Sequence, residues 1–138
     1  MKWIKLSIIS GFSIFLDAKE TELISTFSIV ARDSQTGEWG VAVQSKLVAV
    51  GAIVPYAEAG VGAIATQAWG NPSFGPIGLK LLKSGKNAQA ALNLMIDADP
   101  RRSHRQIAII GEEGNASIHT GMNCLDWAGH KTGPGYAV

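Results

Sequence analysis

Thr26 stands at the point where a processed chain would begin. It opens an apolar, strand-like stretch, 26–33, directly after a leader that resembles a secretion signal. If cleavage exposes Thr26, its hydroxyl is a nucleophile and its own α-amine is the base that activates it. Enzymes with an N-terminal nucleophile hydrolyse amides with this pair. The position of Thr26 therefore indicates chemistry at an amide or acyl carbonyl, without naming a substrate.

Two strands, 26–33 and 38–46, flank the turn 34–37 and predict a β-hairpin, because a glycine closes the turn. A register that places Arg32 opposite Glu38 gives an opposite-charge cross-strand pair and sorts the side chains by face. One face then carries large apolar groups and the other carries mostly small groups, so both faces are expected to be buried. Such a hairpin belongs to a sheet that lies between other layers.

In that register Thr26, Gln44 and Lys46 share one end and one face of the hairpin. Lys46 lies diagonally beyond Thr26, about 7–8 Å away by backbone, which its long side chain can span. A lysine ammonium there keeps the α-amine neutral or stabilises an oxyanion, so we predict Thr26, Lys46 and Gln44 as catalytic residues. Two plainer interpretations stay open: Lys46 extends into water from a strand end, and Gln44 is an ordinary polar residue at a sheet end.

The rest of the chain predicts an α+β fold with mostly antiparallel sheets, because strands flank a central pair of helices. The apolar pattern and the Gly, Pro and Asn positions mark the boundaries. The expected elements are a bend and strand over 47–55 ended by Pro55, a central strand 61–66, a loop 67–72, a helix capped by Ser73 and stopped by Gly85, a helix capped by Asn87 and ended by Pro100, and a hairpin of strands 105–110 and 116–120.

The leader, residues 1–25, has the basic start and the apolar stretch, 6–16, of a signal peptide. That stretch is too short to span a bilayer, which takes about 20 residues. Cleavage after Ala18 and cleavage after Ser25 are both conceivable, and only the second exposes Thr26. We expect export to the periplasm or the exterior if the leader is cleaved. The other interpretation is an uncleaved N-terminal helix or a start codon assigned too far upstream.

Charge and composition argue against several partners. The net charge of +1 gives no electrostatic basis for binding nucleic acid, and no membrane contact is expected beyond the leader. The basic cluster 101–105 follows acidic residues and a proline, so we interpret it as a solvated loop.

His119, Cys124 and His130 have the residue types of a zinc site, but no fourth ligand lies near them in the sequence. We interpret the histidines as structural or turn residues, and we expect no metal and no organic cofactor. A nucleophile pair formed by Cys124 and His130 stays open as an alternative.

Several motifs together resemble one bacterial and archaeal family. They are Thr26-Phe27-Ser28-Ile29-Val30-Ala31, Gly40-Val41-Ala42-Val43-Gln44-Ser45-Lys46, and the stretches 49–51, 59–63, 65–67, 74–76, 119–121 and 128–130. On these motifs residues 26–138 are similar to domain-of-unknown-function family 1028. The resemblance implies an Ntn-hydrolase-like αββα sandwich, the four-layer fold of hydrolases with an N-terminal nucleophile, and it implies Thr26 as that nucleophile.

The resemblance also implies a place for the oxyanion. The loop after Thr66 lies where proteasome-like enzymes place an oxyanion amide, so the predicted oxyanion and substrate loop comprises Gln67, Trp69, Gly70 and Asn71. Two departures stand out. Proteasome-like sites have an aspartate near the place of Gln44 and a lysine on the next strand, whereas here Lys46 would have to substitute. Family members continue past residue 138, so we expect 26–138 to be a domain truncated at its C-terminus, without part of the second sheet and an outer helix layer.

These observations predict an exported amidohydrolase that acts on a small-molecule or peptide substrate after residues 1–25 are removed. The alternative is a non-catalytic module on the same fold, whose 69–72 loop binds a ligand or a partner. A thiol or metal hydrolase built on Cys124 is a third hypothesis, and assembly into a homo-oligomer is left open.

Overall fold

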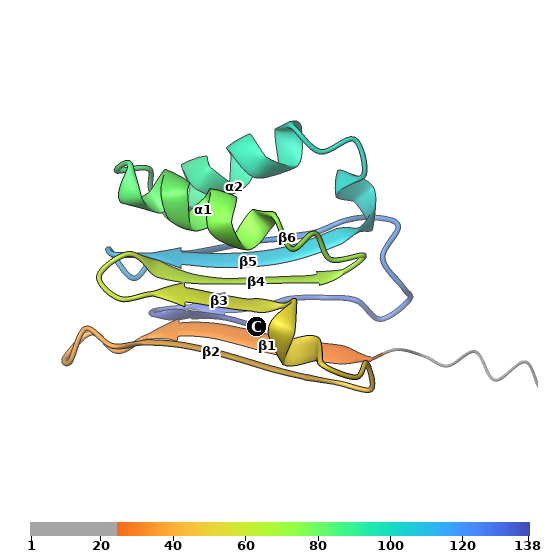
Figure 1. Ribbon diagram of the computed structural model, residues 1–138, viewed down its shortest axis with the longest axis horizontal. Coiled ribbons are helices and arrows are strands. Elements are labelled where there is room, and N and C mark those ends of the chain that lie inside the picture. The colour runs from red at the N-terminus through yellow and green to blue at the C-terminus, as the bar shows by residue number, and fades with distance from the viewer. Residues whose placement is uncertain (1–24) are drawn as a thin grey trace, which may run out of the picture.

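The computed structural model describes residues 25–138, so the leader predicted for 1–25 lies almost entirely outside the described residues. Eight strands and two α-helices follow one another in the chain (Figure 1). Their bounds are β1 (Thr26–Arg32), β2 (Trp39–Ser45), β3 (Pro55–Glu58), β4 (Gly62–Ala68), α1 (Phe74–Lys83), α2 (Ala88–Asp97), β5 (Arg105–Gly111), β6 (Ala116–Thr120), β7 (Thr132–Gly133) and β8 (Tyr136–Ala137), with short 3-10 turns η1 (Val50–Ala52) and η2 (Arg102–His104).

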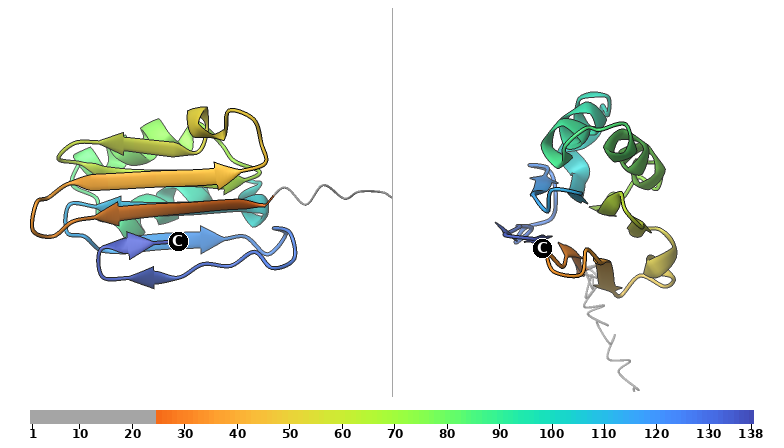
Figure 2. Two further views of the ribbon diagram at one scale, coloured as in Figure 1. Left: turned by 90° about the horizontal axis from the view of Figure 1, so that it is seen from below. Right: turned by 90° about the vertical axis from the view of Figure 1, so that its left-hand side faces the viewer.

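The strands form two four-stranded antiparallel sheets, in the orders β2-β1-β8-β7 and β3-β4-β5-β6. We call them the hairpin sheet and the central sheet. The helices cover one face of the central sheet, and the hairpin sheet packs against its other face (Figures 1 and 2). This arrangement confirms the predicted α+β sandwich with antiparallel sheets. Within the described part of the chain, no helix is long and apolar enough to cross a membrane.

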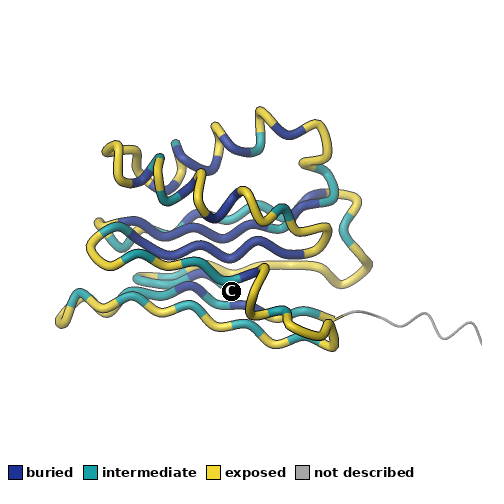
Figure 3. The backbone as a smooth tube through the Cα atoms, viewed as in Figure 1, coloured by how far each residue is buried: buried dark blue, intermediate teal, exposed yellow. Residues whose placement is uncertain are grey.

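Strand β4 is buried on both faces, which explains the continuous apolar stretch 62–65 with which it begins. On the helix side, Ile64 packs with Leu92 and Met95 of α2. On the other side, Ala63 and Ala65 pack against the hairpin sheet in a second apolar cluster. Small side chains in this second cluster let the two sheets approach closely. The buried stretch of β4 and β5 is continuous along the middle of the molecule (Figure 3).

The helix boundaries agree with the sequence analysis. Asn87 caps α2, since its Oδ1 accepts a hydrogen bond of 2.8 Å from the Ala90 amide. Gly85, with φ 85°, takes the left-handed conformation that ends α1. Ser73 occupies the N-cap position of α1 but makes no side-chain cap hydrogen bond. Instead its own amide donates to Asn71 Oδ1 at 3.1 Å.

The hairpin register is one residue away from the predicted one. Arg32 pairs with Trp39 rather than Glu38, and Thr26 pairs with Ser45. The loop has four residues instead of three, because the Asp33 amide donates to the Glu38 carbonyl and Gly37 adopts φ 74°. Arg32 lies 5.3 Å from the Trp39 ring centroid, so a cation–π contact replaces the expected charge pair.

This shift exchanges the two faces of β2 relative to β1. Thr26 now shares a face with Ser45, and Gln44 belongs to the outward face together with Phe27. That outward face of the hairpin sheet is exposed within the described residues, with Phe27 58% accessible, so the expectation that both faces are buried was wrong for this part of the chain. The view in Figure 2 shows β1 and β2 with no described element in front of them.

Three smaller expectations also need correction. Pro55 begins β3 instead of ending a strand, a position where its missing N–H costs no ladder hydrogen bond. The segment before it contains η1. Gln67 and Ala68 extend β4 and so do not belong to a loop. Arg105, expected in a solvated cluster, is buried at the start of β5, because its guanidinium pairs with buried Asp99 at 2.7 Å.

Candidate functional site

A cavity of about 630 Å³ opens at the end of the sandwich where β1 begins, β4 ends and β5 begins. The antiparallel pairing of β4 with β5 brings Gln67 opposite Gln106 at this end. The loop between β6 and β7 forms the remaining wall. Residues that line the cavity include Thr26, Ser28, Gln67, Ala68, Trp69, Gln106, Asn123, Cys124, Leu125, Asp126 and Trp127.

Thr26 lies in this wall, partly buried, at the first position of β1. Its Oγ1 is 3.0 Å from Ser45 Oγ. Ser45 Oγ also accepts a hydrogen bond from the Leu47 amide at 3.1 Å, and either hydroxyl can donate in the contact between Ser45 and Thr26. Because Ser25 precedes Thr26 in the described chain, the Thr26 nitrogen is a peptide amide here, and only cleavage would convert it to a base.

The structure does not bring Gln44 and Lys46 to Thr26. Gln44 is exposed on the outward face of β2. Lys46 is an exposed residue in the bend after β2, and it does not line the cavity. Within the described residues, the polar side chains nearest to Thr26 in the hydrogen-bond pattern are those of Ser45 and Gln67.

A chain of side-chain hydrogen bonds runs from β1 across β4 and β5 to the β6–β7 loop. Gln67 Nε2 donates to the Thr26 carbonyl oxygen at 3.5 Å and to Gln106 Oε1 at 2.5 Å. Gln106 Nε2 donates to Thr120 Oγ1 and to the Gly129 carbonyl, both at 2.9 Å. Thr120 Oγ1 lies 2.8 Å from His130 Nδ1. We call this series the amide relay.

The predicted oxyanion loop, 67–71, is divided by the structure. Gln67 and Trp69 line the cavity, whereas Gly70 and Asn71 do not. The Trp69 amide already donates to the His104 carbonyl at 3.1 Å. The Asn71 amide donates to Thr66 Oγ1 at 3.3 Å, so Asn71 supports the start of α1. The role of the Gly70 amide as an oxyanion donor stays a prediction.

The backbone of Trp69 is held in place by a buried ion pair. Arg105 Nη1 donates to the Trp69 carbonyl, while Arg105 Nε donates to Asp99 Oδ2 at 2.7 Å. The hydrogen bond from Arg105 holds the pKa of the Asp99 carboxyl below its ordinary value, and burial opposes this effect. Trp69 as a residue is 68% exposed. The backbone of Trp69 is therefore anchored and its side chain faces solvent at the rim.

The β6–β7 loop is anchored at Gly121 and strained at Trp127. A side chain at Gly121 would meet the Ser103 carbonyl oxygen at 2.2 Å, so the close approach to η2 requires glycine. Trp127 has φ 68° and is fully exposed, and Ala68 across the cavity has φ 64°. Non-glycine residues rarely adopt this left-handed conformation, and such strain gathers at ligand sites. Two strained residues therefore flank one cavity.

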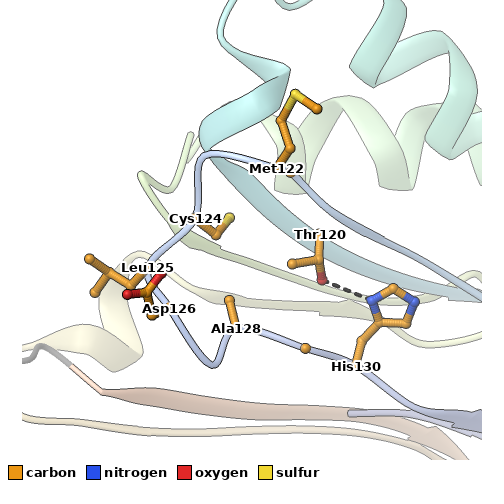
Figure 4. Close-up of a pocket in the computed structure, with 9 residues that line it drawn as sticks. Thr120, Met122, Cys124, Leu125, Asp126, Ala128 and His130 are labelled. Carbon is orange, nitrogen blue, oxygen red and sulfur yellow. Dashed lines mark hydrogen bonds between the residues drawn. The ribbon is translucent and has the colours of Figure 1, made fainter.

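A second cavity of about 450 Å³ is lined by the same loop and by Thr120 (Figure 4). Cys124 and His130 both line it, but His130 Nδ1 contacts Thr120, and Cys124 Sγ donates to the Arg105 carbonyl at 3.6 Å. Burial raises the pKa of the Cys124 thiol, which disfavours the reactive thiolate. His119 Nε2 lies 2.8 Å from the Arg102 carbonyl. In the described range no group of three His, Cys, Asp or Glu residues could hold a metal ion.

Sequence reasoning missed Gln106 and Trp127, which line the main cavity, and Ser45, which contacts Thr26 but does not line the cavity. Ser45 was hidden by the one-residue register error, since a four-residue loop would have placed it opposite Thr26. Gln106 was detectable, because pairing β4 with β5 through their apolar stretches aligns it with Gln67. Trp127 has no local sequence signal, because it lies in a glycine-containing loop whose path depends on contacts with η2.

Comparisons with known proteins agree with this description. A family model described as "Family of unknown function (DUF1028)" matches residues 26–138. The crystal structure of protein SPO2555 from Silicibacter pomeroyi, which is assigned to the same family, is similar with a TM-score of 0.78 and 32% sequence identity. The match covers 81% of this chain and 50% of that one, so this chain spans about half the length of the related structure. A search of curated proteins found no match. With the family model covering the whole of the described domain, the chain belongs to the DUF1028 family, a family of unknown function.

Proposed function

We propose that this domain is an amidohydrolase with an N-terminal nucleophile, in which Thr26 attacks an amide or acyl carbonyl after residues 1–25 are removed. The observation that carries the proposal is the place of Thr26: the first residue of a strand, in the wall of a 630 Å³ cavity, with its hydroxyl 3.0 Å from Ser45 Oγ. The strained backbone of Ala68 and Trp127 beside the same cavity supports a functional site there.

The reaction follows from one residue that carries both groups. The Thr26 hydroxyl oxygen bonds to the carbonyl carbon while its proton passes to the α-amine. The C–N bond then breaks, and the ammonium returns this proton to the leaving nitrogen, which departs as an amine. An ester remains on Thr26. Water attacks the ester and gives a proton to the α-amine, and that proton restores the Thr26 hydroxyl as the carboxylic acid leaves.

Protein mass spectrometry of the secreted chain tests the processing step, with a mature N-terminus at Thr26 as the expected result. In an amide-substrate screen, Thr26→Ala is expected to reduce hydrolysis at least 10³-fold, on the order of what loss of a nucleophile costs. Thr26→Ser retains hydrolysis because the hydroxyl is kept. The control is Thr36→Ala, which alters the exposed hairpin loop and leaves hydrolysis unchanged. A different mature N-terminus, or full activity in Thr26→Ala, would falsify the mechanism.

A second candidate is a non-catalytic ligand-binding module on the same fold. It is favoured by the exposed rings of Trp69 and Trp127 at the cavity, and by the position of Lys46 outside it. Such a module would bind its ligand with Thr26 still in mid-chain. Equal ligand affinity in the uncut chain and in the chain cut before Thr26, with no turnover in either, is the result that selects this candidate.

A further inference from the structure

Large apolar side chains that face solvent gather at one end of the sandwich. In the described part of the chain, six large apolar residues are more than half exposed, and all six lie around the main cavity or in the neighbouring loops at its end of the molecule. These six residues, which we call the apolar end, are Phe27, Val48, Trp69, Met122, Leu125 and Trp127. Single exposed apolar residues are normal on a protein surface, whereas a cluster of them marks an interaction site.

The β6–β7 loop contributes three of the six and is held at its base. The Asn123 amide donates to the Ser103 carbonyl of η2 at 2.7 Å. Beyond this base Leu125 points away from the strands that the loop connects (Figure 4), and Trp127 is fully exposed. The loop therefore keeps apolar side chains in water, and this unfavourable exposure is removed only if another surface covers them.

Exposed cations lie beside the apolar end. Arg101 and Arg102 belong to η2 and its first flanking residue, and η2 is the turn that holds the base of the loop. Lys46 is exposed in the bend that follows β2. Two exposed carboxylates, those of Asp97 and Asp126, lie at the same end. Cations therefore outnumber acids around the exposed apolar side chains.

The opposite end of the sandwich has the reverse charge. In its turns and at the adjoining ends of the strands and of α1, the acids are Asp33, Glu38, Glu58, Glu112 and Glu113, and the cations are Arg32, Lys83 and Lys86. The net charge of +1 conceals this asymmetry, and the expectation of no membrane contact rested on that net value. An anionic partner is attracted to the apolar end and repelled from the opposite one.

We propose that the apolar end binds the surface of an anionic lipid bilayer, with Leu125 and Trp127 inserted among the headgroups. The charged groups of Lys46, Arg101 and Arg102 then lie against lipid phosphates. Exposed tryptophan and leucine beside lysine and arginine are the side chains that suit the boundary between water and a membrane. The main cavity then opens beside the membrane, and the binding does not depend on cleavage before Thr26.

The leader is joined to the domain at this same end. Ser25 lines the main cavity, where β1 begins (Figure 1). Residues 17–25 span at most about 30 Å when fully extended. A bilayer that holds the apolar stretch 6–16 is therefore within reach of the apolar end, which favours a membrane over a second copy of the chain as the partner.

A fluorescent NBD label on the full-length chain tests the proposal. The label is attached through Leu125→Cys in a Cys124→Ser background, and Gln35→Cys at the opposite end is the matched control. With vesicles that contain phosphatidylglycerol, emission from position 125 is expected to shift to shorter wavelength and to be quenched by spin-labelled lipid, while emission from position 35 is unchanged. Binding through the leader alone would leave both labels in water. No shift at position 125, or equal shifts at both positions, overturns the proposal.

Charge variants test the lipid contacts. Arg101→Gln together with Arg102→Gln is expected to raise the lipid concentration for the half-maximal shift by about 30-fold, because each cation at an anionic surface contributes about fivefold. Lys83→Gln together with Lys86→Gln, at the opposite end, is the control and leaves this concentration unchanged. The proposal is wrong if vesicles of phosphatidylcholine alone give an equal shift. It is also wrong if the shift appears without vesicles and grows with protein concentration, since a second copy then covers the apolar end. The comparison of lipids stands even if a charge variant does not fold.

Discussion

At the scale of single residues, the pair formed by Asp99 and Arg105 links the core to the candidate site. Both side chains are about nine-tenths buried, and Arg105 also holds the Trp69 carbonyl. Removing one member of such a pair leaves the other charge buried without compensation, which costs far more than loss of a surface pair. The backbone that carries Trp69 therefore depends on a carboxylate that does not line the cavity.

Asp99→Asn is expected to lower the free energy of unfolding by about 3–5 kcal/mol at pH 7, measured by urea denaturation. The control is Glu58→Gln, which breaks the exposed 2.6 Å pair between Glu58 and Lys83 and is expected to cost less than about 1 kcal/mol. Equal losses in the two variants would contradict the importance of burial.

The same aspartate predicts a pH dependence. Its folded-state pKa is lowered, mainly by the hydrogen bond from Arg105. Its contribution is thus fully present above about pH 4, the range of an unfolded aspartate, and is lost as the pH falls through the lower folded-state pKa. The stability difference between wild type and Asp99→Asn should therefore shrink as urea titrations move from pH 7 to pH 3. A constant difference across this range would show that Asp99 does not titrate as described.

At the scale of elements, α1 packs against its neighbours through glycines that leave no room for a side chain. A Cβ at Gly78 would meet Ile64 Cδ1 at 2.4 Å and Met95 Sδ at 3.1 Å. A Cβ at Gly75 would meet the Tyr56 ring at 2.2 Å. The position of α1 sets the loop that precedes it, and this loop carries Trp69.

Gly78→Ala is expected to destabilise the fold by about 1–3 kcal/mol, because the extra methyl group overpacks the interface between α1 and β4. Gly51→Ala is the matched control, since nothing lies within 4 Å of a Cβ there. Thermal unfolding followed by circular dichroism measures both. A stability gain in Gly78→Ala, as expected for a helix with free space, would show that this contact is loose.

The elements also show what the sequence could and could not predict. Helix caps and apolar strands are local signals, so Asn87, Gly85 and β4 were predictable. The hairpin register depended on whether the loop has three or four residues. The plausible charge pair between Arg32 and Glu38 favoured the three-residue loop, which was wrong. That single error placed Gln44 instead of Ser45 beside Thr26, because a one-residue slip turns every side chain of a strand to the other face.

At the scale of the whole molecule, the sandwich has one filled interface and one open face. Ala65 of β4 lies between the two sheets, 1% exposed, whereas Ala42 of β2 lies on the outward face of the hairpin sheet and is exposed. β2 is also an edge strand of its sheet. The two alanines therefore report on opposite sides of the same layer.

Ala65→Lys is expected to prevent stable folding, because it buries an unpaired ammonium between the sheets. Ala42→Lys is expected to change the free energy of unfolding by less than about 0.5 kcal/mol, since lysine is well tolerated on an exposed edge strand. Urea denaturation and the fraction of soluble protein measure both effects. A severe loss in Ala42→Lys would mean that something outside residues 25–138 covers this face.

The cavity itself could be predicted only in part, because it is assembled from strand ends and a loop far apart in the sequence. Thr26 and Gln67 were identified from motifs, but their proximity comes from the stacking of two sheets. The β6–β7 loop reaches the cavity through the close contact of Gly121 with Ser103, which no local pattern announces.

The amide relay has a consequence for how such sequences diverge. Each glutamine in it determines the orientation of the other. Replacing Gln67 alone therefore leaves the Gln106 Oε1 without this donor, and replacing Gln106 alone leaves one Gln67 N–H without this acceptor. The hydrogen bond between the two glutamines is partly buried, and a polar atom left without its partner there lowers stability. We therefore expect the effects of substitutions at these two positions to depend on each other, so that related sequences change both residues together. A double-mutant cycle across Gln67 and Gln106 should show strong coupling.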